Sequence, residues 1–184
     1  MRVIATVGMP GSGKSEAAEV AREMDIPVVT MGDVIRREVK KRDLEPSDDN
    51  MGEIATELRD EEGMDAVAAR CIDMISEKDS DVVFVDGVRG WSEAERFRQE
   101  FGDDFTLVAI EVPFETRLNR IRERGRSDDL STEKELRRRD ERELGYGMGE
   151  AIEKADETVE NTGSLDEFRR KMKSLLKDLK QKSQ

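Results

Sequence analysis

A glycine-rich segment close to the start of the chain combines residue types that suit phosphate binding. Its sequence, GMPGSGKS at 8–15, fits the pattern G-x-x-x-x-G-K-[ST] and lies between an apolar run and a segment with helical periodicity. Glycines let the backbone amides point inward around a phosphate, and the following helix directs its positive end at the same anion. We expect Lys14 to reach the β- and γ-phosphates of ATP and the Ser15 hydroxyl to bind Mg²⁺. The expected nucleotide-binding residues of this segment are Gly8, Met9, Pro10, Gly11, Ser12, Gly13, Lys14 and Ser15.

An acidic residue that ends another apolar run is a second candidate metal ligand. The run DVVFVD ends at Asp86, and an aspartate at the carboxyl end of a buried parallel strand can hold Mg²⁺ directly or through water. Such an aspartate can also cap a turn, but its occurrence together with the glycine-rich segment favours the metal role. The chain has no histidine and a single cysteine, Cys71, which excludes zinc and imidazole chemistry. Catalysis is therefore left to lysine, arginine, aspartate, glutamate, serine or backbone groups.

Short apolar runs alternate along the chain with segments of helical periodicity, and this alternation positions both motifs. Because strand and helix follow one another repeatedly, the pattern predicts an α/β fold with a parallel sheet covered by helices on both faces. No linker-like composition divides the 184 residues, so a single domain, 1–184, is expected. The expected strands are 2–7, 27–30, 81–86, 105–110 and 156–160. The expected helices are 14–24, 33–42, 50–60, 64–78, 92–100, 114–124, 132–144 and 164–181.

The charge composition limits the partners that the chain can have. A formal net charge of −12 argues against general nucleic-acid binding and against membrane-surface binding, since phosphate groups would be repelled. There is no cleavable leader and no run of 18 apolar residues, so we expect a cytoplasmic protein. The chain has 11 lysines, 21 arginines and 44 acidic residues. This acidic, lysine-poor composition indicates either ordinary solubility or a halophilic adaptation to a salty cytoplasm.

Three motifs resemble those of adenylate kinase and other nucleoside monophosphate kinases. They are GMPGSGKS, the segment VVTMGDVIRREV with its T-x-G-D-x-x-R pattern, and DGVRG. The resemblance implies that Thr30, Gly32, Asp33 and Arg36 line an acceptor pocket, where Arg36 and Arg89 grip the acceptor's phosphate. Two guanidinium groups can hold one dianion bidentately. Asp33 is a base or a hydroxyl-orienting group if the acceptor is an alcohol, and part of the binding pocket if it is a phosphate.

An arginine-rich stretch at about 117–145 resembles the lid that closes over the triphosphate in the same kinases. Arg117, Arg120 and Arg124 share one helix face, and further arginines follow. Any single one of them can also belong to a solvated helix face with ion pairs. The expected lid residues are Arg120, Arg124, Arg126 and either Arg138 or Arg139.

The segment AIEKADETVENTGSLDEFRRKM is similar to the end of dephospho-CoA kinases, where the loop after the last strand passes near the adenine. That similarity implies contacts from Asn161, Thr162 and Gly163. Over nearly all of its length the chain resembles an archaeal family of P-loop kinase-like proteins related to adenylate kinase and dephospho-CoA kinase. The resemblance implies a three-layer P-loop NTPase sandwich with strand order 2-3-1-4-5 and a short helical lid. It also implies an acceptor-binding helical insert at about 33–78, with Arg59 and Arg70 as further acceptor candidates.

These motifs lead to two functional hypotheses. The first is an ATP- and Mg²⁺-dependent phosphotransferase that moves the γ-phosphoryl group to a small nucleotide-like acceptor, of the nucleoside monophosphate or dephospho-CoA type. The second is a nucleotide-gated binding module with slow ATPase activity that acts on an RNA or protein partner. An assembled acceptor pocket favours the first hypothesis.

Overall fold

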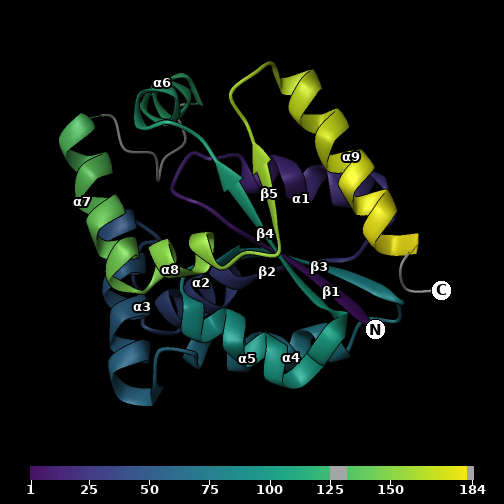
Figure 1. Ribbon diagram of the computed structural model, residues 1–184. Helices are drawn as coiled ribbons and strands as arrows, with labels where there is room; N and C mark the ends of the chain where they lie inside the picture. Colours follow the sequence, from purple (N-terminus) through teal and green to yellow (C-terminus); the bar gives the residue numbers. More distant parts are fainter. Residues whose placement is uncertain (125–131, 182–184) are drawn as a thin grey trace.

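The computed structural model describes residues 1–124 and 132–181, apart from the side chain of Arg124. Within these residues, five parallel strands form one sheet in the order β2-β3-β1-β4-β5 (Figure 1). The predicted α/β class, parallel sheet and strand order are therefore confirmed. The strands are β1 (Arg2–Val7), β2 (Val28–Thr30), β3 (Val82–Val88), β4 (Phe105–Glu111) and β5 (Glu157–Glu160).

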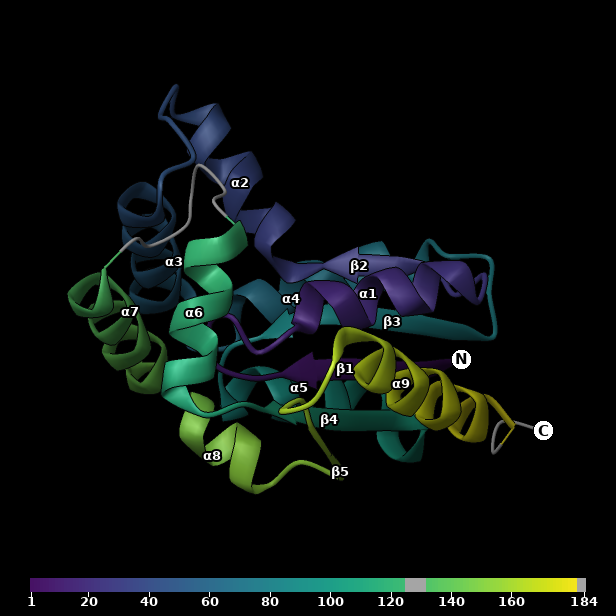
Figure 2. The same ribbon diagram turned by 90° about the horizontal axis from the view of Figure 1, so that it is seen from above.

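Both faces of the sheet are buried, which explains why the central strands are apolar without alternation. Along β1, Ile4 packs into the core on one face, whereas Val3 and Ala5 pack into the core on the other. The first face is covered by α1 (Lys14–Glu23) and α9 (Leu165–Gln181). The second face is covered chiefly by α4 (Ala66–Ser76), α5 (Trp91–Phe101) and α8 (Met148–Glu153), as Figures 1 and 2 show.

Four further helices gather at the carboxyl ends of the strands, as Figure 2 shows. Of these, α2 joins the core of the second face through Val34 and Ile35, and α3 joins it through Ile54 and Leu58. The start of α7 is fixed by a capping box, in which the Thr132 hydroxyl accepts from the amide of Glu135. The four helices are α2 (Met31–Lys41), α3 (Asp48–Glu62), α6 (Phe114–Arg124) and α7 (Glu133–Gly145).

An irregularity between β1 and β3 shapes the edge where these helices meet. Thr6 pairs with Asp86 but Val7 pairs with Val88, so Gly87 is left over as a bulge with φ of 100°. A bulge bends its strand and changes the direction of the neighbouring side chains. Asp86 therefore stands at the turning point of β3, directly beside the segment that follows β1.

The remaining elements complete the chain. A short 3₁₀ helix, Gly102–Asp104, precedes β4. The helix α8 was not predicted from the sequence.

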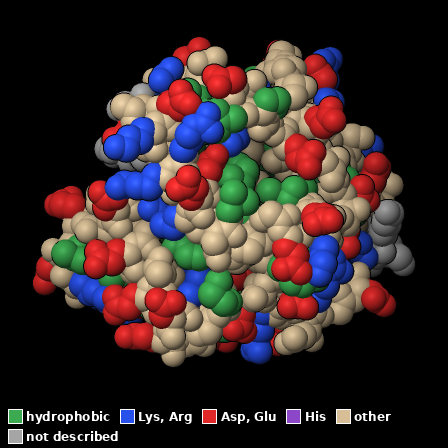
Figure 3. Space-filling model, turned by 60° about the vertical axis from the view of Figure 1, so that its left-hand side comes forward, with side chains coloured by type: hydrophobic (Ala, Val, Ile, Leu, Met, Phe, Trp, Pro, Cys, Tyr) green, Lys and Arg blue, Asp and Glu red, His purple; other side chains and the backbone are tan. Residues whose placement is uncertain are grey.

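On the face shown in Figure 3, acidic and basic side chains lie side by side. Among the described residues, no helix is both long enough and apolar enough to span a bilayer.

Candidate functional site

The glycine-rich loop, residues 8–15, connects β1 to α1 and depends on glycine at several positions. Gly11 and Gly13 have φ of 78° and 108°, a region that L side chains rarely adopt. A Cβ atom at Gly13 would lie 2.6 Å from Asn161 Nδ2, and one at Gly8 would lie 2.7 Å from the carbonyl oxygen of Ile110. The loop is therefore packed closely against β4 and against the segment after β5.

Lys14, at the start of α1, is buried inside this loop. Its ammonium group donates to the carbonyl oxygens of Gly8 at 2.5 Å and Met9 at 3.2 Å. Burial and the nearby charge of Arg89 lower the pKa of Lys14 to about 7, against the opposing effects of Glu143 and Asp86. The ammonium group is thus poorly solvated, and an additional anion at this position would stabilise its charged form.

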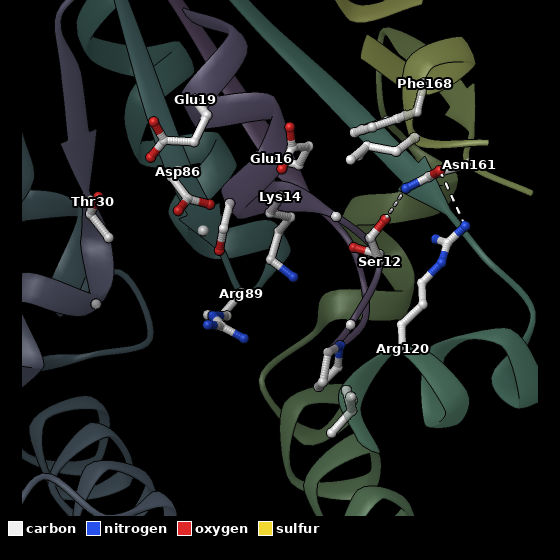
Figure 4. A pocket seen from close by; sticks show the side chains of 18 of the residues that line it. Ser12, Lys14, Glu16, Glu19, Thr30, Asp86, Arg89, Arg120, Asn161 and Phe168 are labelled. Atoms are coloured by element: carbon white, nitrogen blue, oxygen red, sulfur yellow. Dashed lines mark hydrogen bonds between the residues drawn. The ribbon is translucent and has the colours of Figure 1, made fainter. Parts of the chain in front are cut away.

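A cavity of about 440 Å³ opens above the loop at the carboxyl ends of the strands. Lys14 reaches it from the start of α1, and Asp86 and Arg89 reach it from the end of β3 and the residues directly after it (Figure 4). Arg120 and Asn161 lie on the opposite side of the loop, next to Phe168. The lining residues are Pro10, Gly11, Ser12, Gly13, Lys14, Ser15, Glu16, Glu19, Thr30, Gly32, Arg36, Asp86, Gly87, Arg89, Arg120, Ile121, Arg139, Asn161, Gly163, Leu165 and Phe168.

The carboxylate of Asp86 and the guanidinium group of Arg89 lie close enough at the end of β3 to affect each other's pKa. Burial raises the pKa of Asp86, and the positive charges of Lys14 and Arg89 act against that rise. The backbone amide of Arg89 donates to Glu93 Oε2 at 2.7 Å, which fixes the chain immediately after the bulge. The Asp86 carboxylate thus lies among cations, an arrangement that suits a magnesium and polyphosphate site.

Glu143 on α7 is the second carboxylate of this cluster. Its Oε2 accepts from Arg89 Nη1 at 2.5 Å and its Oε1 accepts from Arg139 Nε at 3.2 Å. Burial alone would raise the pKa of Glu143, but Arg89, Arg139 and Lys14 together hold it at about 2. The carboxylate is therefore ionised and links α7 to the end of β3.

Asn161 fastens the segment after β5 to the glycine-rich loop. Its Nδ2 donates to the carbonyl oxygen of Ser12 at 2.9 Å, and its Oδ1 accepts from Arg120 at 3.4 Å (Figure 4). The Ser12 Oγ and the Arg120 Nη1 are buried beside the cavity without a hydrogen-bond partner in the described structure. Buried polar atoms are rarely left unpaired in folded proteins. An unpaired serine hydroxyl on the glycine-rich loop and an unpaired guanidinium nitrogen on α6 fit a ligand rich in oxygen acceptors, such as a nucleoside triphosphate.

Comparisons with known proteins identify the family. A family model described as an AAA domain matches residues 7–137. The chain is 57% identical over 176 residues to a UPF0200 protein of Methanosarcina acetivorans, with 96% of this chain and 94% of the relative covered. The chain belongs to the UPF0200 family. A UPF0200 protein of Halobacterium salinarum is 50% identical over 178 residues, covering 96% of this chain and 93% of the relative.

Among the solved structures with the same fold are three from bacteria. They are TT1252 of Thermus thermophilus, with a TM-score of 0.64 and 18% identity over 97% of both chains, and two kinases. A gluconokinase of Sinorhizobium meliloti has a TM-score of 0.60 and 17% identity, covering 97% of this chain and 93% of its own. A shikimate kinase of Aquifex aeolicus has a TM-score of 0.54 and 18% identity, covering 95% and 96%. The predicted relation to an archaeal family with a P-loop kinase-like fold is confirmed.

The cavity of this UPF0200 protein brings together most of the residues that the sequence singled out. The P-loop residues from Pro10 to Ser15 line it together with Thr30, Gly32, Arg36, Asp86, Arg89, Arg120, Asn161 and Gly163. Gly8 and Met9 do not line it. Their carbonyl oxygens accept hydrogen bonds from the Lys14 ammonium group. Asp33 is half exposed and accepts from Arg36 at 2.8 Å, outside the cavity lining. The side chain of Arg124 and the whole of Arg126 lie outside the described residues.

The arginines in and around the expected lid differ in whether they line the cavity. Arg139 lines the cavity, whereas Arg138 is largely exposed and donates to Asp49 at 2.6 Å. Arg117 is buried and donates to Asp140 and to the carbonyl oxygen of Pro10. Of the two alternatives that the sequence left open, only Arg139 is placed at the site.

A smaller cavity of about 80 Å³ adjoins the first and shares Gly32, Gly87, Arg89 and Arg139 with it. Arg59 lines this second cavity and pairs with Glu93 at 2.6 Å. Arg70 lines neither cavity and donates to Glu62. The other lining residues are Met31, Ile35, Asp48, Met51, Gly52, Ala55, Val67, Arg142, Glu143 and Tyr146.

Sequence reasoning missed Glu143, although a signal for it was present. Leu136, Asp140 and Glu143 are spaced four and three residues apart, so they share one helix face, and all three are buried. Two acids on the same face as a buried leucine are unusual unless cations pair with them.

Proposed function

We propose that this UPF0200 protein binds Mg-ATP on the P-loop and transfers its γ-phosphoryl group to a small nucleotide-like acceptor, of the nucleoside monophosphate or dephospho-CoA type. The observation that carries the proposal is the convergence of Lys14, Asp86, Arg89 and Arg139 on one cavity. Phosphoryl transfer needs positioning and charge neutralisation more than covalent help. These four side chains provide both.

The donor nucleotide would lie along the P-loop. The backbone amides of the loop and Lys14 would bind its phosphates, while Ser15 and Asp86 would hold Mg²⁺. The bound ion would neutralise charge on the phosphate oxygens. Arg120, Asn161 and Gly163 form the wall nearest the apolar Leu165 and Phe168, where the base would lie.

The acceptor would approach from the opposite wall, which Thr30, Gly32 and Arg36 provide. The second cavity continues from this wall between α2, α3 and α7. In this proposal α2, α3 and α4 form the acceptor-binding insert and α6 and α7 form the lid. Two proteins with similar folds are a gluconokinase and a shikimate kinase, which supports phosphoryl transfer as chemistry that this architecture can house.

The match to an AAA domain model favours one alternative, a nucleotide-gated binding module with slow ATPase activity. In that case an RNA or protein partner would take the place of the small acceptor. The two functions differ in what stimulates the consumption of ATP.

ATP consumption, measured with and without nucleoside monophosphates, dephospho-CoA and short RNAs, distinguishes these functions. We expect one small acceptor to stimulate consumption, and we expect Lys14→Ala to abolish it while the fold remains intact. Lys177→Ala, which changes an exposed lysine of α9, serves as the control and should behave like the unmodified protein. Slow consumption that no small acceptor stimulates would favour the binding module, and an active Lys14→Ala variant would refute both.

A further inference from the structure

Glu143 is a buried charge that the proposed transfer does not itself require. Its side chain is 5% exposed, at the boundary between the two cavities. Burying a carboxylate is costly unless cations and hydrogen bonds compensate for the lost water. A site that binds anionic phosphates gains nothing from an extra negative charge in direct contact with the phosphates. The position of Glu143 therefore calls for an explanation in terms of its partners.

The two oxygens of Glu143 are divided between two arginines. Oε2 accepts from Arg89, which follows the bulge of β3, and Oε1 accepts from Arg139, on the same helix as Glu143. Both arginines line the P-loop cavity, whereas Glu143 lines only the second cavity. The carboxylate thus stands behind the two guanidinium groups relative to the P-loop, where it can hold them without occupying their place.

Two further acidic residues contact the backbone of Arg89 and the side chain of Arg139. The amide of Arg89 donates to Glu93 at 2.7 Å, and Glu93 in turn pairs with Arg59 at 2.6 Å. Arg139 lies 3.4 Å from Asp48 at the start of α3. We call this series of alternating charges the charge chain: Arg59, Glu93, Arg89, Glu143, Arg139, Asp48 and Arg142.

The charge chain joins α3, α5, the end of β3 and α7, and Glu143 is its middle member. Removing Glu143 would separate the half that holds Arg89 from the half that holds Arg139. The two guanidinium groups would then repel each other in a poorly solvated space. Each would be free to turn toward water and away from the P-loop.

We propose that Glu143 is a positioning residue, which holds Arg89 and Arg139 at the P-loop cavity so that both can neutralise charge during phosphoryl transfer. This inference rests on the proposed function. Misplacing catalytic groups by about 1 Å can cost about 100-fold in rate, so the effect of Glu143 should fall on turnover. Binding of Mg-ATP should not weaken, because loss of a negative charge makes the cavity more attractive to phosphates.

The test compares Glu143→Gln, Glu143→Asp and the unmodified protein. Calorimetry gives the affinity for Mg-ATP, consumption of saturating Mg-ATP in the presence of the acceptor panel gives turnover, and thermal unfolding gives stability. Glu133→Gln is the matched control, since Glu133 is an exposed residue of α7 whose partner Arg137 is also exposed. We expect Glu143→Gln to lose about 100-fold in turnover with unchanged or tighter binding of Mg-ATP. Glu143→Asp, which keeps the charge on a shorter side chain, should lie between Glu143→Gln and the unmodified protein.

The other possible outcomes show whether the proposed function or only the positioning role of Glu143 fails. If the unmodified protein does not bind or consume Mg-ATP, the proposed function fails, and the positioning role fails with it. If it does, and Glu143→Gln turns over at the unmodified rate, only the positioning role is overturned. Parallel losses of affinity, turnover and stability in both Glu143 variants would show that the residue merely anchors α7. If Glu143→Gln does not fold, the affinity and turnover of Glu143→Asp decide, because a split between them remains measurable.

Discussion

The buried ion pair between Arg117 and Asp140 should carry a large share of the stability of the region around the P-loop. The two side chains join α6 to α7 by a bidentate contact, with N–O distances of 3.0 and 2.7 Å. They are only 5% and 12% exposed. Arg117 also donates to the carbonyl oxygen of Pro10 at 2.9 Å, so the pair supports the loop directly.

The variant Asp140→Asn leaves the Arg117 guanidinium buried without a counter-charge. Breaking a buried pair in this way costs about 3–5 kcal/mol, and the lower figure applies here because asparagine keeps one acceptor oxygen. In a chain of this size each kcal/mol shifts the unfolding midpoint by about 2–4 °C. The midpoint should therefore fall by about 6–12 °C.

The matched control is Asp49→Asn, since Asp49 also pairs with an arginine of α7. That arginine is Arg138, and the two side chains are 74% and 59% exposed. Exposed pairs contribute about 0–1 kcal/mol, so the control should change the midpoint by at most about 4 °C. Thermal unfolding followed by circular dichroism measures both variants under identical conditions. Equal shifts in the two variants would refute the assignment of stability to burial of the pair.

A double variant separates the loss of attraction from the cost of an unpaired charge. Arg117→Met with Asp140→Leu removes both charges, and such replacements are often neutral or stabilising. We expect it to be more stable than Asp140→Asn, although the carbonyl of Pro10 loses its donor. If the double variant is the less stable of the two, the attraction itself, and not the stranded guanidinium, dominates the energy of the pair.

Three further predictions concern the reactivity of the Cys71 thiol, the loss of stability at low pH and the effect of salt on the unfolding midpoint. Burial raises the pKa of Cys71 to about 12, so the thiol should resist alkylation in the folded protein and react only as denaturant unfolds it; rapid labelling without denaturant contradicts this. The pKa of Glu143 is about 2, against an ordinary value of 4.5, so its stabilising effect should be present above about pH 4.5 and be lost as the pH falls toward 2. Urea unfolding at several pH values measures the difference in the free energy of unfolding between the unmodified protein and Glu143→Gln. This difference should shrink as the pH falls through that range, and a constant difference would contradict the prediction. Salt adaptation, one of the two explanations for the acidic, lysine-poor composition, predicts that the unfolding midpoint rises between dilute buffer and molar KCl. A midpoint that stays level or falls would leave ordinary solubility as the explanation.

The sheet could be predicted because its determinants are local. The runs VIATV, VVFV and TLVAI show no alternation of apolar and polar residues, and threonine is their only polar residue type. This is the pattern expected of strands that are buried on both faces. The helix α8 was missed because it has only six residues and begins after Gly147, so periodicity gives little signal over its length. The expected strand 81–86 also ends two residues before β3 does, because β3 continues through a bulge at Gly87 to Val88.

Some residues of the site are likewise specified by a local sequence pattern, whereas others are brought together from distant parts of the chain. The P-loop follows from the spacing of its glycines, its lysine and its serine, all within eight residues. In contrast, the partner of Arg89 is 54 positions away in α7, and no local pattern specifies that contact. Asp33 was expected in the acceptor pocket, yet it pairs with Arg36 one helical turn later, as charges at that spacing commonly do.

The attachment of Asn161 to the carbonyl of Ser12 has a consequence for the order in which the protein matures during synthesis. The P-loop is synthesised well before the amide that braces it, since Asn161 lies 149 positions after Ser12. A nascent chain that stops before β5 will carry the whole loop without this support. Competence to capture a nucleotide should therefore be acquired only once β5 and the segment that follows it have been made, which ties ligand capture to the synthesis of a distant part of the chain.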